Sequence, residues 1–190
     1  MIHEFKECLD ESHRMQDLPI WTELYAKAFP GGVAIPHPTD GEHQRAGIDR
    51  SVVLANSKQI LIDEKVRHPH KDGRPWVWDD VLLEYVSNDR TNAPGWVVKA
   101  LRADYIAYAI LQTGKCYLLP VIQLQQAWLK HRDAWLAKYK VRAAQNRTYR
   151  TLSCPVPVDV LFPAIGSCLR AECTPMSWEQ LSLFMSTKAA

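Results

Sequence analysis

The strongest constraint on the fold of this chain is a predicted β-hairpin with an aspartate at the open end of each strand. Two β-prone runs, residues 52–54 and 60–62, flank a turn-forming segment at 55–58. Asp49 precedes the first run, Asp63 ends the second, and Asn56 lies midway between the two aspartates. The spacing therefore places both carboxylates at the same level of one hairpin.

The number of residues in the turn decides which way the two side chains point. An odd loop centred on Asn56 pairs Asp49 with Asp63, with Cβ atoms roughly 4.5–5.5 Å apart on one face. An even loop pairs Asp63 with Arg50 and turns Asp49 to the other face, unless a bulge restores the register. Only the odd or bulged hairpin assembles a cation site, and we predict that one.

Lys65 belongs to the same polar cluster. Alternation along a strand puts Leu61, Asp63, Lys65 and Arg67 on one face and Glu64 behind them. Hydrolysis of a phosphodiester uses a hard cation held by oxygen ligands, which lowers the pKa of an attacking water. A nearby ammonium orients that water or neutralises developing charge. The two aspartates and Lys65 supply these groups.

This pattern resembles the active site of the PD-(D/E)XK nuclease superfamily, the restriction-endonuclease-like fold. Asp49 matches its first acidic position, Asp63 the second and Lys65 the lysine, while Ile48 stands where the proline of the motif would be. The resemblance covers roughly residues 17–122 and the chain looks similar to phage or prophage-type members. It implies an αβββαβ core and a Mg²⁺- or Mn²⁺-dependent nuclease, a hydrolase acting on DNA.

The resemblance also implies a further metal ligand on the first helix. A helix is predicted to start near Asp17-Leu18-Pro19 and to end at Pro30-Gly31-Gly32. Glu23 is the candidate ligand by position. The alternative is an i, i+4 salt pair between Glu23 and Lys27.

The remaining pattern predicts an α/β (α+β) fold with a mixed β-sheet of about five strands flanked by helices. Further strands are expected at 79–87, 105–110 and 116–122, the first of them beside the hairpin. Residues 31–45 are expected to be a loop leading into the site, and 95–102 have room for only a short helix. From 151 the proline-rich chain predicts an edge strand or extended arm, followed by a helix at 177–185.

Basic side chains gather in two segments outside the hairpin. Arg67, Lys71 and Arg74 lie in or next to the loop 68–75, which is either a DNA-contacting loop or a solvated connection. Between 123 and 150, seven Lys and Arg accompany one acid, an excess of six, on a predicted helix (123–139) and the residues after it. This segment includes Lys130, Lys138, Lys140 and Arg142. It is either a phosphate-backbone contact or a solvated face.

Length and composition set the outer limits. A chain of 190 residues suits a single domain, here a nuclease-like core with a basic helix at about 123–142 and a C-terminal arm at 151–190. The net charge of +2 identifies no partner. No long apolar run and no signal peptide are found, so a cytoplasmic protein without a membrane partner is expected. Homo-oligomer formation through the arm is a further expectation.

Three classes of function remain open. The first is a DNA nuclease using Asp49, Asp63 and Lys65. The second is a catalytically inactive nuclease-fold module of a mobile element that binds DNA or a protein. The third is a plain interaction protein in which an Asp beside a Lys is a solvated surface pair, worth less than ~1 kcal/mol.

Overall fold

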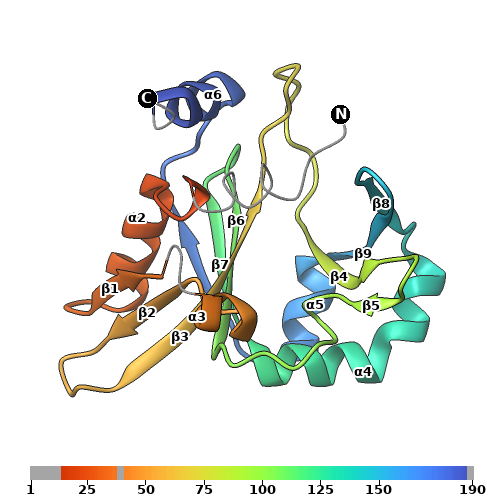
Figure 1. Cartoon of the computed structure of the whole chain (residues 1–190), viewed down its shortest axis with the longest axis horizontal. Coiled ribbons are helices and arrows are strands. Elements are labelled where there is room, and N and C mark those ends of the chain that lie inside the picture. The colour runs from red at the N-terminus through yellow and green to blue at the C-terminus, as the bar shows by residue number, and fades with distance from the viewer. Residues whose placement is uncertain (1–13, 38–40, 188–190) are drawn as a thin grey trace. The chain divides into compact units, whose positions relative to one another are not determined.

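The computed structural model describes residues 14–37 and 41–187 (Figure 1). The described chain divides into two compact units. The large-sheet unit contains the described residues up to Val77, then Arg102–Leu119 and the described residues from Leu169. The small-sheet unit contains Trp78–Leu101 and Pro120–Cys168.

A six-stranded mixed sheet forms the large-sheet unit, in the order β1-β2-β3-β6-β7-β10. The strands are β1 (Val33–Pro36), β2 (Arg50–Val53), β3 (Gln59–Arg67), β6 (Tyr105–Ile110), β7 (Lys115–Pro120) and β10 (Leu169–Glu172). The central pair β3 and β6 is parallel, while β1–β2, β2–β3 and β7–β10 are antiparallel. The expected α+β class and mixed sheet are confirmed, with six strands in place of about five.

One face of this sheet is covered by α2 (Pro19–Ala28), and we call it the α2 face. The helix begins at Pro19, so the predicted start is confirmed. Proline is tolerated at this position because the N–H that it lacks would have no partner within the helix. Trp21, Leu24 and Tyr25 are buried in a cluster with Ile62 of β3 and Ala107 of β6. The predicted C-terminal helix is also present as α6 (Trp178–Thr187), and its Leu181 joins the same cluster.

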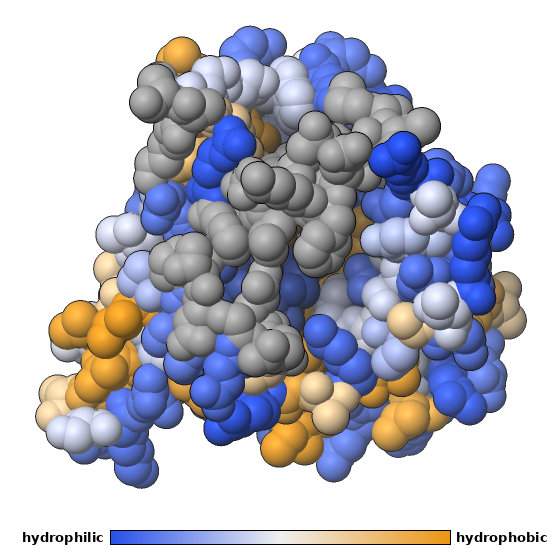
Figure 2. Space-filling view, in the orientation of Figure 1, coloured by the Kyte–Doolittle hydropathy of each residue, from blue (hydrophilic) through white to orange (hydrophobic). Residues whose placement is uncertain are grey.

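The segment 31–45, expected to be a loop, contains β1 and a short helix, α3 (Gly41–Ala46). Its prolines and its lack of large apolar residues are not typical of a strand, so the sequence did not predict β1. Val33 pairs with Val53 and Pro36 with Arg50, so β1 exists because the edge of β2 is available to it. Pro36 is tolerated because β1 is itself an edge strand. Val33 and Ile35 are 62% and 43% exposed, at the hydrophobic patch that covers β1 in Figure 2.

A four-stranded antiparallel sheet in the order β5-β4-β9-β8 forms the small-sheet unit. The strands are β4 (Asp80–Asn88), β5 (Ala93–Pro94), β8 (Arg142–Gln145) and β9 (Arg150–Pro157). The prediction that 79–87 lies beside the hairpin was wrong, because β4 pairs with β9 in this second sheet. The short helix predicted at 95–102 is also absent, and turns occupy residues 96–98.

The proline-rich C-terminal region is more regular than expected. β9 lies inside the small sheet although it contains Pro155 and Pro157. Proline is tolerated here because β8 pairs only with residues 150–153, so Pro155 has a partner strand on one side alone. The helix α5 (Val158–Ile165) follows directly, and only β10 matches the predicted edge strand.

The predicted basic helix is confirmed as α4 (Val121–Lys138). Its buried side chains recur at helical spacing and include Leu124, Ala127, Trp128 and Trp135. Its basic residues Lys130 and Lys138 are exposed. Within the described residues, no helix is long and apolar enough to cross a membrane.

Candidate functional site

The β2–β3 hairpin has the odd register that the sequence predicts. Arg50 pairs with Ile62 and Val53 with Gln59, which leaves a five-residue connection centred on Asn56. The Leu54 N–H donates to the Lys58 carbonyl, and Ser57 has φ 62°, so the turn closes with a residue in the left-handed region. Continuing this register by one residue places Asp49 opposite Asp63.

Asp49 lies immediately before β2, and hydrogen bonds hold both its N–H and its carboxylate. Its N–H donates to the Ile62 carbonyl at 2.9 Å. Its carboxylate accepts the Glu64 N–H on Oδ2 at 2.7 Å and the Gln16 side-chain amide on Oδ1 at 3.1 Å. The Glu64 N–H and the Gln16 amide thus fix the direction in which the Asp49 carboxylate points.

Asp63 is 3% exposed and contacts two charged neighbours. Lys65 Nζ donates to its Oδ1, and the Asp49 carboxylate lies beside it. Burial raises the pKa of Asp63 to about 7 and the Asp49 carboxylate adds to this rise, while Lys65 opposes it. A neighbouring carboxylate disfavours the charged form of Asp63, and a cation beside the pair relieves this repulsion.

Lys65 lies on the same strand face as Asp63, as alternation along β3 predicts. Its side chain is 31% exposed, and its Nζ also donates to the Glu64 carbonyl at 3.3 Å. The ammonium therefore has one side against the acidic pair and another open to solvent. The structure brings Asp49, Asp63 and Lys65 together.

A second polar cluster supports the pair from the α2 face. Glu64 Oε1 accepts hydrogen bonds from Arg50 Nε at 2.6 Å and from the Tyr25 hydroxyl at 2.7 Å. Arg50 Nη2 donates to the Gln16 carbonyl. Gln16 therefore joins both clusters, because its side chain holds Asp49 and its backbone holds Arg50. Nothing in the sequence singles out these four residues, apart from Glu64, an acid on the strand face opposite Asp63.

Two acceptors near the pair lack hydrogen-bond partners although both are buried. They are Gln16 Oε1 and Glu64 Oε2. Buried polar atoms are nearly always satisfied, so each such atom calls for a water or an ion. Burial also raises the pKa of Glu64 to about 7, against the effect of Arg50. The site is therefore short of positive charge and of donors.

Glu23 is placed away from this site. Its Oε2 accepts the Thr174 N–H at 2.8 Å, and this bond lowers its pKa. Thr174 follows β10, which is separated from β3 by β6 and β7. At ~4.8 Å per strand this separation is roughly 14 Å. The prediction of Glu23 as a third ligand is corrected accordingly: it fastens α2 to the segment after β10.

Two histidines of the segment 31–45 lie beside the acidic pair. His37 Nε2 and Ser51 Oγ are 2.7 Å apart, and the His37 N–H donates to the Asp49 carbonyl. Ser51 pairs with Leu61, so it lies on the same sheet face as Asp63. His43 stacks on His37 with ring centroids 4.2 Å apart. The sequence predicts only that this segment leads to the site.

Two of the three basic residues in or next to the loop 68–75 lie against aromatic rings of the same unit. The Arg67 guanidinium lies 4.7 Å from the Trp76 ring centroid, and Lys71 Nζ lies 4.6 Å from that of Trp178. Arg74 is exposed and 3.6 Å from Asp72. The Arg67 and Lys71 charges thus each have a partner within this unit, and a role in DNA binding stays a prediction.

The other predicted nucleic-acid contacts belong to the small-sheet unit. Lys130, Lys138, Lys140 and Arg142 are all exposed. Lys138 Nζ lies 5.4 Å from the Tyr139 ring centroid, and the Arg142 guanidinium lies 5.8 Å from that of Trp78. Their charged groups remain accessible to an anionic partner.

The donor set fits a magnesium ion that retains several waters. Among the described residues, no group of three or more His, Cys, Asp or Glu side chains is arranged to hold a metal. Mg²⁺ commonly uses one or two carboxylates with water and substrate oxygens, and a carboxylate pair satisfies that need. No family model, curated protein or solved structure matches this chain. Membership of the nuclease superfamily therefore stays a prediction.

Proposed function

We propose that this protein is a divalent-metal-dependent nuclease that hydrolyses phosphodiester bonds of DNA. The observation that supports it most is the contact between the Asp49 and Asp63 carboxyl groups across the hairpin, with Lys65 on Asp63. A buried Asp63 beside a half-buried Asp49 and a partly exposed ammonium is costly for folding alone. It is well suited to bind a cation and a phosphate.

Each residue has a defined role in this proposal. Asp49 and Asp63 hold Mg²⁺ or Mn²⁺, which when bound polarises the phosphate and acidifies a water molecule. Lys65 carries the charge that orients this water or stabilises the charge developing on the phosphate. Gln16 and the Glu64 N–H keep the Asp49 carboxylate in position. Arg50 and Tyr25 hold Glu64 behind the pair.

One observation favours a second candidate, a nuclease-fold module that binds DNA or a protein without cleaving it. Both oxygens of Asp49 already accept hydrogen bonds from the protein. A carboxylate has about four lone-pair sites, so these bonds reduce the capacity of Asp49 for a metal without removing it. Metal binding and cleavage separate the two candidates.

The direct test is cleavage of supercoiled plasmid, linear duplex and single-stranded DNA with Mg²⁺ or Mn²⁺. We expect cleavage by the wild-type protein that EDTA stops and that Asp63→Asn lacks. Asp72→Asn is the matched control, because the Asp72 side chain is 65% exposed and lies outside the hairpin. Equal cleavage by wild type and Asp63→Asn would refute the site, and binding of metal without any cleavage would support the second candidate.

A further inference from the structure

The strand β1 leaves one edge of the large sheet open. Among the described strands it is the last in the order of its sheet, and β2 is its partner on the other side. Val33 and Ile35 are 62% and 43% exposed, and Figure 2 shows the hydrophobic patch that they belong to. A strand edge of this kind is a template for pairing with another strand.

The other described edge strands are less suited to pairing with a second copy of the chain. β10 carries Arg170 and Glu172, and β8 carries Arg142, and charged side chains are a common protection of strand edges. β5 consists of two residues, one of them a proline. Residues 28–39, which include β1, contain no Asp, Glu, Lys or Arg. Two copies of β1 can therefore meet without repulsion between like charges.

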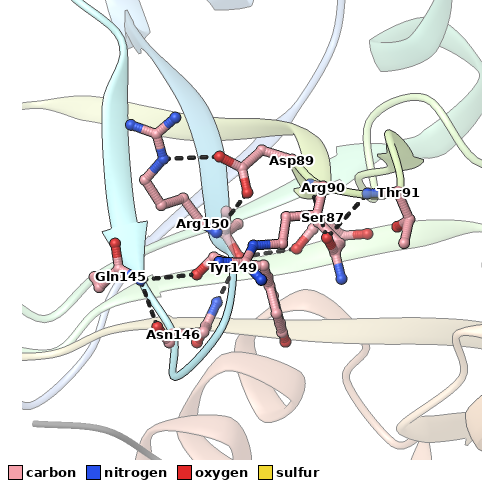
Figure 3. Close-up of polar contacts among 10 residues, drawn as sticks. Ser87, Asp89, Arg90, Thr91, Gln145, Asn146, Tyr149 and Arg150 are labelled. Atoms are coloured by element: carbon pink, nitrogen blue, oxygen red, sulfur yellow. Dashed lines mark hydrogen bonds and ion pairs between the residues drawn. The ribbon is translucent and has the colours of Figure 1, made fainter.

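The end of β8 is also engaged by contacts within its own unit. Gln145 Nε2 donates to the Tyr149 carbonyl at 3.3 Å, as Figure 3 shows. The strand beside β8 is fastened to the end of β4, where Asp89 accepts the Arg150 N–H at 2.8 Å (Figure 3). The hydrogen-bonding groups at this end of the small sheet thus have partners inside the unit, which leaves β1 as the stronger candidate.

The backbone groups of β1 point alternately to β2 and to the open edge. The His37 N–H donates to the Asp49 carbonyl at 2.9 Å. Alternation then directs the N–H groups of Val33 and Ile35 to β2 as well, in register with Val53 and Ser51. The backbone groups of residues 32, 34 and 36 therefore face the open edge.

Ala34 supplies the donor at this edge. The Gly32 N–H donates to the Phe29 carbonyl at 2.9 Å, and Pro36 has no N–H. Within the described part of the chain, this leaves the Ala34 N–H and carbonyl as the pair of groups that a further strand would meet. A partner strand that satisfies this one residue satisfies the edge.

We propose that the protein forms a two-fold symmetric dimer in which β1 pairs antiparallel with β1 of a second copy, with Ala34 on the two-fold axis. In this register the two Ala34 residues exchange N–H and carbonyl groups. Val33 lies opposite Ile35 of the second copy, and the symmetry repeats this contact. Four exposed aliphatic side chains thus become two cross-strand pairs. Gly32 lies opposite Pro36, where neither residue has a donor to leave unpaired.

The symmetry also sets the size and the strength of the assembly. The same strand serves both copies, so the contact closes at two chains. Four residues a side bury less than the ~1,200 Å² of a stable interface, so we expect a dissociation constant above about 1 μM. Ile35 pairs with Ser51, which shares its sheet face with Asp63, so both acidic pairs lie on one face of the joined sheet. The pairing of β1 does not depend on the proposed nuclease activity.

The experiment is analytical ultracentrifugation of the full chain from about 1 to 500 μM, a range chosen around the weak binding expected of a small interface. The test variant is Val33→Lys/Ile35→Lys, which changes two exposed side chains. The matched control is Val77→Lys/Val98→Lys, because these side chains are 74% and 48% exposed and lie outside β1. Circular dichroism and thermal unfolding of each variant verify that it folds.

We expect the wild type to pass from monomer to dimer across this range, and the control to do the same. The test variant should have a dissociation constant at least about 10-fold higher, since both apolar pairs become lysines facing lysines. A wild type that stays monomeric at every concentration, or one that forms assemblies larger than a dimer, would overturn the proposal. Equal dissociation constants for the wild type and the test variant would do the same.

A cysteine crosslink tests the register without depending on the lysine variant. Residues paired by two hydrogen bonds across antiparallel strands have Cα atoms about 5.5 Å apart, which suits a disulfide. Oxidised glutathione should therefore join two copies of Ala34→Cys. Asn56→Cys, in the exposed hairpin turn, is the control, and the wild type measures any linkage through the native cysteines. Linkage of Ala34→Cys no faster than that of the control would exclude a two-fold axis at Ala34.

Discussion

Asp49 and Asp63 face each other across the β2–β3 hairpin, and the Asp49 carboxylate lies close enough to raise the pKa of the buried Asp63. Two carboxylates are both acceptors, so neither can supply a donor to the other. A divalent cation would satisfy both groups. If the proposed function is right, occupancy of the pair links metal binding and stability.

We predict that Asp63→Asn and Lys65→Ala abolish or strongly reduce cleavage while leaving the fold intact. Both side chains lie on the polar face of β3 and serve charge chemistry more than packing. Loss of the Lys65 ammonium should lower kcat by about 10²- to 10³-fold, the usual effect of removing one electrostatic stabiliser. Steady-state cleavage with circular dichroism checks this, and unfolding of both variants would indicate a structural role.

We expect Mg²⁺ or Mn²⁺ to stabilise the wild-type protein against heat. A ligand at 100 times its Kd adds about 2.7 kcal/mol to the free energy of unfolding. The gain should vanish in Asp63→Asn, which lacks one of the two anionic ligands, and persist in Asp72→Asn. Thermal unfolding with and without metal measures this effect, and equal metal-induced shifts in wild type and Asp63→Asn would place the metal elsewhere.

Metal-free stability should fall as pH rises from about 4 to about 7. Burial raises the pKa of both Asp63 and Glu64 to about 7, above the ordinary range near ~4 for carboxyl groups. Between these values the folded state holds more protons than the unfolded state, so the free energy of unfolding decreases with pH. Urea unfolding in EDTA from pH 5 to 8 measures the slope. Asp63→Asn should flatten it, and an unchanged slope would contradict the assignment.

Removal of Arg50 should destabilise the protein through Glu64. Arg50→Met leaves the Glu64 side chain, only 4% exposed, without its cationic partner, which for a buried pair costs ~3–5 kcal/mol. Glu64→Gln in the same chain should recover part of that loss. Urea unfolding of the two single variants and the double variant gives the coupling energy, and additive effects would show that the two side chains are independent.

Arg67 and Lys71 should contribute to stability and not to DNA affinity. Each cation lies over a tryptophan ring, a contact worth ~0.5–1 kcal/mol at an exposed site. We expect Arg67→Gln/Lys71→Gln to lower thermal stability modestly, with duplex DNA binding close to that of the wild type. A clear drop in affinity, with the fold intact, would restore the loop 68–75 as a DNA contact.

The hairpin could be predicted from the sequence because its determinants are local. Two β-prone runs, a short turn and alternation along β3 suffice to place Asp49, Asp63 and Lys65 together. Gln16 could not be predicted, since its contact with Asp49 depends on how the chain before α2 crosses the end of β2. Glu23 was misplaced because helical position alone does not say which strand a side chain faces.

The second sheet was not predictable for a related reason. β4 has the composition of any half-buried strand, and its choice of β9 as a partner depends on residues about 70 positions later. Pro155 argued against an interior strand in the sequence. It is acceptable there because β8 pairs only with residues 150–153 and does not reach it. The local sequence predicts that β4 is a strand, and pairing with a distant segment determines which sheet it joins.

The route of the chain makes the two units mutually dependent during synthesis. The chain passes between them at Val77, Leu101, Leu119 and Cys168, so the parallel partners β3 and β6 are separated by a segment that belongs to the other unit. The large sheet gains its second edge strand only when β10 has left the ribosome. The β2–β3 hairpin has been synthesised long before that. No single truncation yields either unit whole, so isolating the large-sheet unit requires two excisions and new connections.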